Sequence, residues 1–135
     1  MLLLIDLDNT LIDRRAAFKT WALSRFGAAE APWLIEADRD GYERRELLAG
    51  MIAERYGIDA AEILTELRAG MVEYVVLDPR VAAALGDATA AGFVPVVVSN
   101  GAVARQEAKL RRTGLDRLVA ACESAGWRRG PMVRT

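Results

Sequence analysis

Two carboxylates stand two residues apart at the end of an apolar segment near the start of the sequence. The segment LLLIDLD begins at Leu2 and ends on Asp6 and Asp8. Carboxylate oxygens bind Mg²⁺, and a carboxylate can also attack phosphorus to form an acyl phosphate. An ordinary turn is the alternative, because Asp side chains often end a strand by hydrogen bonding to nearby backbone groups. The spacing alone leaves both interpretations open.

A second group of polar residues follows the other strongly apolar segment. Residues 94–98 read VPVVV, and Ser99, Asn100 and Gly101 come directly after them. Ligands of open α/β sheets bind beyond the carboxyl ends of the strands, and a hydroxyl beside a helix N-terminus suits a phosphate group. Taken alone, this segment also fits a plain turn with a helix cap. Two strands that place polar groups at one edge favour a phosphate-handling site.

Composition excludes several other kinds of site. The chain has no His, so a Ser–His or Cys–His nucleophile pair and a His-ligated metal are ruled out. The single Cys122 allows no internal disulfide, and its apolar surroundings predict a buried side chain. The net charge of −1 gives no argument for a nucleic acid or membrane partner. No segment approaches the ~18 apolar residues of a membrane span, and we expect a cytoplasmic protein.

The spacing of apolar residues predicts the elements that carry these side chains. We expect buried parallel strands at 2–7 and 94–98, and a weaker third strand at 118–122. Helical patterns cover 14–26, 42–56, 59–75, 79–91 and 102–113. One crossover helix is enough to connect two parallel strands, and 79–91 provides it. The helices before it are surplus, so we expect a helical subdomain inserted after the first strand.

Together these features resemble the haloacid dehalogenase (HAD) superfamily. The strand followed by Asp6-Leu7-Asp8-Asn9-Thr10 is similar to the first motif of that family, and Ser99-Asn100-Gly101 is similar to its second. The resemblance implies an α/β, Rossmannoid parallel sheet with about three strands present. It assigns residues 1–13 and 78–135 to this core, and residues 14–77 to a helical cap that closes over the site.

The resemblance also implies a role for each motif residue. Asp6 would be the nucleophile and a Mg²⁺ ligand, and Asp8 the general acid and base with its backbone carbonyl on the metal. Ser99 and Asn100 would hold the phosphoryl group, and Thr10 would support the turn. Because the dehalogenase branch of the family lacks a carboxylate at the Asp8 position, the implied activity is Mg²⁺-dependent hydrolysis of a small phosphorylated metabolite. A phosphomutase shares all of these motifs.

The sequence departs from the family pattern after Glu123. Family members carry a Lys there, followed by a further strand that ends in acidic residues. Here Arg129 is the nearest match to the Lys, and no acid follows it. A frameshift, a second chain that completes the sheet, or a reduced form with residual or no activity would each explain this ending. Without the further strand, the apolar first strand becomes an exposed edge, through which two copies could associate.

Overall fold

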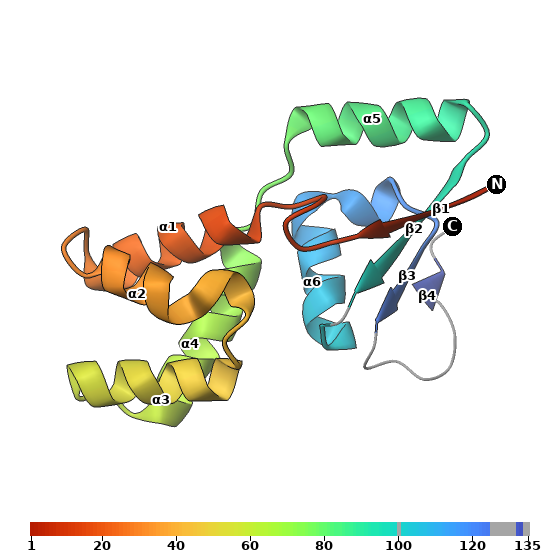
Figure 1. Cartoon of the computed structure of the whole chain (residues 1–135). Coiled ribbons are helices and arrows are strands. Elements are labelled where there is room, and N and C mark those ends of the chain that lie inside the picture. Colours follow the sequence, from red (N-terminus) through yellow and green to blue (C-terminus); the bar gives the residue numbers. More distant parts are fainter. Residues whose placement is uncertain (100, 125–131, 134–135) are drawn as a thin grey trace. The chain divides into compact units, whose positions relative to one another are not determined.

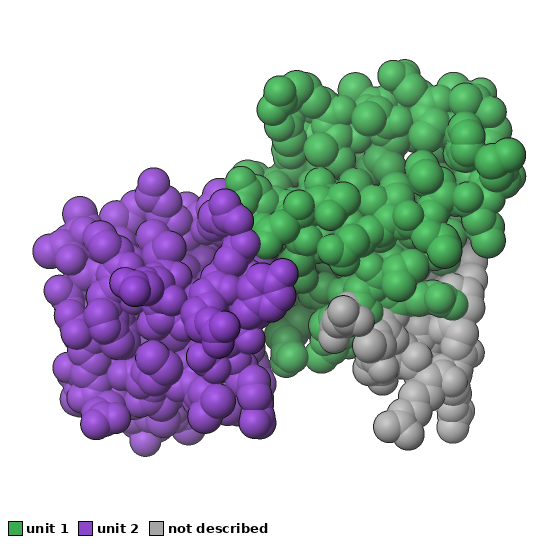
Figure 2. Space-filling model, in the orientation of Figure 1, with its two compact units in different colours: residues 1–13, 75–135 green, residues 14–74 purple. Residues whose placement is uncertain are grey.

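The computed structural model describes residues 1–99, 101–124 and 132–133. The chain divides into two compact units, which Figure 2 shows in different colours. The first unit comprises residues 1–13 and 75–135, and the second comprises residues 14–74. Among the described residues, no helix is long and apolar enough to cross a membrane.

The first unit is built on a mixed sheet in the order β1-β2-β3-β4 (Figure 1). Strands β1 (Leu2–Asp6), β2 (Val94–Ser99) and β3 (Ala121–Ser124) are parallel, which confirms the expected three-stranded parallel sheet. A short β4 (Met132–Val133) pairs antiparallel with β3 and was not expected. Strand β3 begins at Ala121, not at 118, because a 3₁₀ turn over Leu115–Arg117 occupies the chain just before it.

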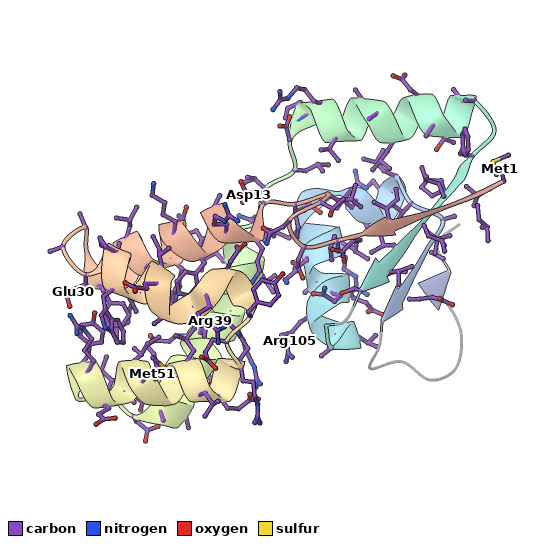
Figure 3. All side chains as sticks on the ribbon, in the orientation of Figure 1. Met1, Asp13, Glu30, Arg39, Met51 and Arg105 are labelled. Carbon is purple, nitrogen blue, oxygen red and sulfur yellow. The ribbon has the colours of Figure 1, made fainter. Side chains whose placement is uncertain are left out.

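Strand β1 lies at an edge of this sheet. Among the described residues, only β2 pairs with it. Leu2 and Leu4 alternate with Leu3 and Ile5, and the first two are 66% and 65% exposed. Figure 3 labels Met1 at the amino end of this strand and Asp13 beyond the loop that follows it. The expectation of a buried strand here is therefore wrong: among the described residues β1 has a neighbour on one side only, which leaves an unpaired backbone edge and exposed leucine side chains.

Two helices pack beside the sheet in the first unit. Helix α5 (Pro79–Ala90) contacts β2, and helix α6 (Val103–Thr113) contacts β3. Local sequence signals mark the beginning of α5 and the end of α6. Asp78 caps α5 by accepting a hydrogen bond from the Arg80 N–H, and Gly114 ends α6 in a left-handed conformation with φ of 80°. Cys122 on β3 is buried, as the sequence predicts.

The second unit consists of four α-helices and one short 3₁₀ helix: α1 (Arg14–Phe26), α2 (Ala31–Asp38), η1 (Arg39–Gly41), α3 (Arg45–Tyr56) and α4 (Ala60–Glu73). Its core combines large side chains from the four α-helices, including Phe18, Trp21, Leu34, Leu48, Ile52, Ile63 and Leu67.

Helix α2 was not expected. It has only eight residues and no side-chain cap at Glu30, so it carries little of the signal that marks a helix. The helical pattern at 42–56 also includes Leu47 and Met51, but these two side chains are exposed.

Asp59 provides a measurable test of how the sequence begins α4. Its carboxylate accepts a hydrogen bond from the Glu62 N–H at 3.0 Å, as the capping pattern predicts. We expect Asp59→Ala to lower the free energy of unfolding by about 1 kcal/mol, since that N–H loses its partner. Asp59→Ser, which keeps an acceptor, should lose much less in the same urea titration. Equal losses in the two variants would contradict this role.

Candidate active site

The pairing register brings the ends of β1 and β2 to the same edge of the sheet. Asp6 lies opposite Val98, so Ser99 follows one residue further along the neighbouring strand. Asp6 is exposed, whereas Ser99 is buried with 4% of its surface exposed. Asp6 and Ser99 therefore end adjacent parallel strands, as the sequence predicts.

A tight turn after β1 positions Asp8. The Leu7 carbonyl accepts hydrogen bonds from the N–H groups of Thr10, Leu11 and Ile12, and Leu7 itself is fully buried. Asn9 adopts a left-handed conformation with φ of 60°, which its short polar side chain tolerates. The turn thus fixes the backbone on both sides of Asp8.

Helix α6 supplies two side chains that hold the Asp8 carboxylate. Lys109 Nζ lies 3.0 Å from Asp8 Oδ1, and Gln106 Nε2 donates to Asp8 Oδ2 at 3.2 Å. The Lys109 side chain is only 9% exposed, and Gln106 is almost completely buried. The Asp8 side chain is 30% exposed, so the ion pair is shielded from water mainly on its Lys109 side and is screened less than a fully exposed pair. Asp8 is therefore held through both of its carboxylate oxygens.

The same glutamine also reaches the second strand end. Gln106 Nε2 donates a short hydrogen bond to Ser99 Oγ, and the Gly101 N–H donates to that oxygen at 3.1 Å. Gln106 consequently links Asp8, which follows β1, to Ser99, which ends β2. One buried network joins the two halves of the site.

The roles of Gln106 and Lys109 were not predicted from the sequence. The available signal was their position: they stand three residues apart on the helix directly after Ser99, and so share one face. Leu110 is fully buried next to Lys109, which shows that this face turns inward. Of the other predicted site residues, Asn100 and Arg129 lie outside the described residues.

The Asp6 carboxylate is a group of the kind that binds a magnesium ion. Among the described residues, no hydrogen bond or ion pair holds the Asp6 carboxylate, so its oxygens are available. Mg²⁺ is commonly held by one or two carboxylates together with water and substrate phosphate, and the Asp6 carboxylate supplies oxygens of that kind. The described residues include no cluster of three or more Cys, Asp or Glu that could hold a metal alone.

Gly101 gives the network the space it needs. A Cβ atom added at this position would lie 2.6 Å from Gln106 Cδ, which is far too close. We expect Gly101→Ala to displace the Gln106 side chain, because a flexible side chain moves more easily than backbone. The chain should stay folded, with its free energy of unfolding lowered by about 1–3 kcal/mol, and the NMR signals of the Gln106 side-chain amide should shift strongly. Unshifted signals would contradict the close contact.

By its similarity to solved structures, the parallel sheet with a helical segment inserted after its first strand has the haloacid dehalogenase-like fold. The structure is similar to L-2-haloacid dehalogenase from Xanthobacter autotrophicus with covalently bound chloropropionic acid (TM-score 0.71, 18% identity). It is also similar to a putative beta-phosphoglucomutase from Thermotoga maritima (TM-score 0.67, 16% identity) and to a HAD family hydrolase from Deinococcus radiodurans with bound phosphate and sodium (TM-score 0.60, 22% identity).

These similarities cover most of this chain but little more than half of the other proteins. The matches span 91%, 96% and 87% of this chain, and 56%, 63% and 54% of the three structures, in the same order. No protein-family model and no curated protein matches the sequence. The comparisons therefore confirm the fold that the sequence motifs predict. The three structures are named as a dehalogenase, a putative phosphoglucomutase and a hydrolase, so the fold alone does not select one reaction.

Proposed function

We propose that this chain hydrolyses a small phosphomonoester by transferring the phosphoryl group to Asp6. The observation that carries the proposal is the hydrogen-bonded link from Asp8 through Gln106 to Ser99, at the same edge of the sheet where β1 ends on the exposed Asp6. A nucleophile, an acid–base group and a hydroxyl for the phosphoryl oxygens are the parts that such a reaction needs.

In the first half of the proposed reaction, an Asp6 carboxylate oxygen attacks phosphorus and the bond to the leaving oxygen breaks. Asp8 gives a proton to that leaving oxygen, which departs as an alcohol. In the second half, Asp8 takes a proton from a water molecule as this water attacks the phosphorus of the acyl phosphate. Inorganic phosphate is released, and the Asp6 carboxylate is regenerated.

Ser99 and its surroundings would bind the phosphoryl oxygens. Its hydroxyl lies at the end of β2, directly before the N-terminus of α6, where the first backbone N–H groups of the helix have no partners within the helix. Asn100, by the family resemblance, would add its backbone N–H. Hydrogen-bond donors fixed in advance stabilise the negative charge of a transferring phosphoryl group.

Asp6 and the backbone carbonyl of Asp8 are the groups that would hold Mg²⁺. When bound, the ion neutralises charge between the nucleophile and the phosphoryl group. The Asp8 carboxylate has a different task in this proposal, which is consistent with the contacts of both its oxygens to α6.

The proposal is tested by comparing two substrates. We expect the 135-residue chain to release phosphate from p-nitrophenyl phosphate in the presence of Mg²⁺, and EDTA should stop this release. It should release no chloride from 2-chloropropionate, the class of substrate seen on the Xanthobacter enzyme. Chloride release without phosphate release would identify a dehalogenase and contradict the proposal.

Two further outcomes correspond to the alternatives that the motifs leave open. Transfer of the phosphoryl group between two hydroxyls of a sugar phosphate, without net phosphate release, would identify a phosphomutase. Failure to release either phosphate or chloride would indicate a non-catalytic protein. The free, apolar edge of β1 is the feature that supports this second alternative, because a binding partner or a second copy could pair with it.

A further inference from the structure

We infer that Gln106 and Lys109 on α6 are positioning residues of this site, and that Gln106 sets the direction in which the Ser99 hydroxyl donates its proton. This inference rests on the proposed function for the identity of the ligand, a phosphoryl group. The contacts that carry it belong entirely to the described residues of the first unit.

The orientation of the Gln106 amide follows from its partners. The Asp8 carboxylate only accepts hydrogen bonds, so the amide nitrogen, and not the amide oxygen, must face it. That nitrogen carries two hydrogens. One is directed at Asp8 Oδ2 and the other at Ser99 Oγ, so both are used within the network.

The direction of the Ser99 hydroxyl follows in turn. A serine oxygen has two lone pairs and one hydrogen. Gln106 and the Gly101 N–H both donate to this oxygen, and together they occupy its two lone pairs. The only remaining hydrogen-bonding capacity of Ser99 is its own hydrogen, which must be donated to an acceptor outside this network. Phosphoryl oxygens are acceptors, so the network prepares Ser99 for such a ligand before the ligand binds.

Lys109 acts on Asp8 in a comparable way. Its ammonium group and the Gln106 amide each donate to a different oxygen of the Asp8 carboxylate, and this restricts rotation of that side chain. Because Lys109 is buried on the inward face of α6, its ammonium group is itself confined. The geometry thus points to Lys109 as the residue that positions the acid–base group, while Gln106 positions both Asp8 and the phosphate-binding hydroxyl.

The test is a double-mutant cycle on the binding of inorganic phosphate, measured by calorimetry with the full chain and Mg²⁺. We expect Ser99→Ala to weaken binding about 10- to 100-fold, as expected for a lost hydrogen bond to a charged ligand. Gln106→Leu should weaken it about 10-fold, a typical effect of losing a supporting contact. In the Ser99→Ala background, however, Gln106→Leu should have almost no further effect, since Gln106 acts on phosphate through Ser99.

Controls come from another ion pair on the same helix. Glu107 and Arg111 pair with each other at 3.4 Å, with 27% and 62% of their side chains exposed. Glu107→Gln and Arg111→Met should leave phosphate affinity within about twofold of the wild type, because exposed pairs of this kind contribute little. Independent, multiplicative losses from Ser99→Ala and Gln106→Leu would overturn the inference.

Lys109 is tested by separating rate from binding. We expect Lys109→Met to lower kcat for p-nitrophenyl phosphate about 10- to 100-fold while KM changes less than about threefold, because Lys109 positions the acid–base group and not the phosphate. Lys109→Arg, which keeps the charge, should recover part of kcat. A rise in KM with unchanged kcat would overturn the assignment to Lys109.

A measurement without ligand distinguishes failure of this inference from failure of the proposed function. In NMR spectra of the free chain, both side-chain amide hydrogens of Gln106 should exchange slowly with water, and Ser99→Ala should speed the exchange of one of them. If these hydrogens are protected but phosphate does not bind, the proposed function fails and the positioning geometry stands. Rapid exchange of both hydrogens in the wild type would overturn the geometry.

Discussion

Asp6→Asn is expected to reduce phosphate release from p-nitrophenyl phosphate by at least about 1,000-fold, which is the scale of losing a covalent nucleophile. An amide oxygen is a far poorer nucleophile than a carboxylate and also a weaker Mg²⁺ ligand. The exposed position of Asp6 at the end of β1 means that the substitution removes no buried contact. Stability should therefore change little, and the lost rate can be assigned to chemistry.

The matched control for Asp6 is Asp13, an exposed carboxylate that follows the same turn. Asp13→Asn should retain turnover within about threefold, because the proposed chemistry gives it no role. Circular dichroism should show both variants folded. Equal turnover by the wild type and Asp6→Asn would contradict the proposed nucleophile, even if phosphate release were fast.

Asp38→Ala is expected to lower the free energy of unfolding by about 3–5 kcal/mol. This is the usual cost of removing one partner of a buried ion pair, because the remaining charge stays buried without compensation. Asp38 is buried and accepts two hydrogen bonds from Arg14, both at 2.9 Å, and one from Arg45 at 2.7 Å. It also accepts from the Gly41 N–H at 3.1 Å. The substitution would leave two guanidinium groups close together with no carboxylate between them.

Of these two arginines, Arg45 depends more on Asp38 to compensate for the burial of its charge. Burial lowers its pKa, while the hydrogen bond and charge of Asp38 act in the opposite direction. Its Nη1 atom is buried without a hydrogen-bond partner, so Asp38 and the Glu43 carbonyl hold the guanidinium through Nη2 alone. Loss of Asp38 therefore removes the main compensation for burying this charge.

The comparison for Asp38 is an exposed pair in the same unit. Glu66 accepts a hydrogen bond from Arg25 at 2.8 Å, but both side chains are well exposed. Glu66→Ala should cost less than about 1 kcal/mol. Urea unfolding followed by circular dichroism measures both variants. A loss for Asp38→Ala no larger than that for Glu66→Ala would contradict the role of the buried cluster.

Residues that form regular local patterns were predictable from the sequence. Helix α1 was expected at 14–26 and spans Arg14–Phe26, because Phe18, Trp21 and Ala22 recur at helical spacing and are all buried. The carboxyl ends of β1 and β2 were predictable because apolar strands stop abruptly at Asp6 and Ser99. These local patterns were enough to place three candidate site residues at one edge of the sheet.

Features that depend on tertiary contacts were not predictable in this way. Gln106 and Lys109 look like ordinary polar residues of an exposed helix until α6 packs beside β3 and turns them towards Asp8. Their burial is compensated by partners about 100 residues away in the sequence. Helix α2 depends in the same way on packing, since Ala31 and Leu34 are buried while the helix lacks a side-chain cap.

The central claim is that the phosphoryl group is transferred to Asp6, and chemical trapping tests it most directly. The chain would be mixed with p-nitrophenyl phosphate and Mg²⁺, quenched with acid, and treated with borohydride, which reduces an acyl phosphate but not a free carboxylate. Peptide mass spectrometry should then find homoserine at position 6 in the wild type and none in Asp6→Asn. Phosphate release with an unmodified Asp6 after this treatment would contradict the account.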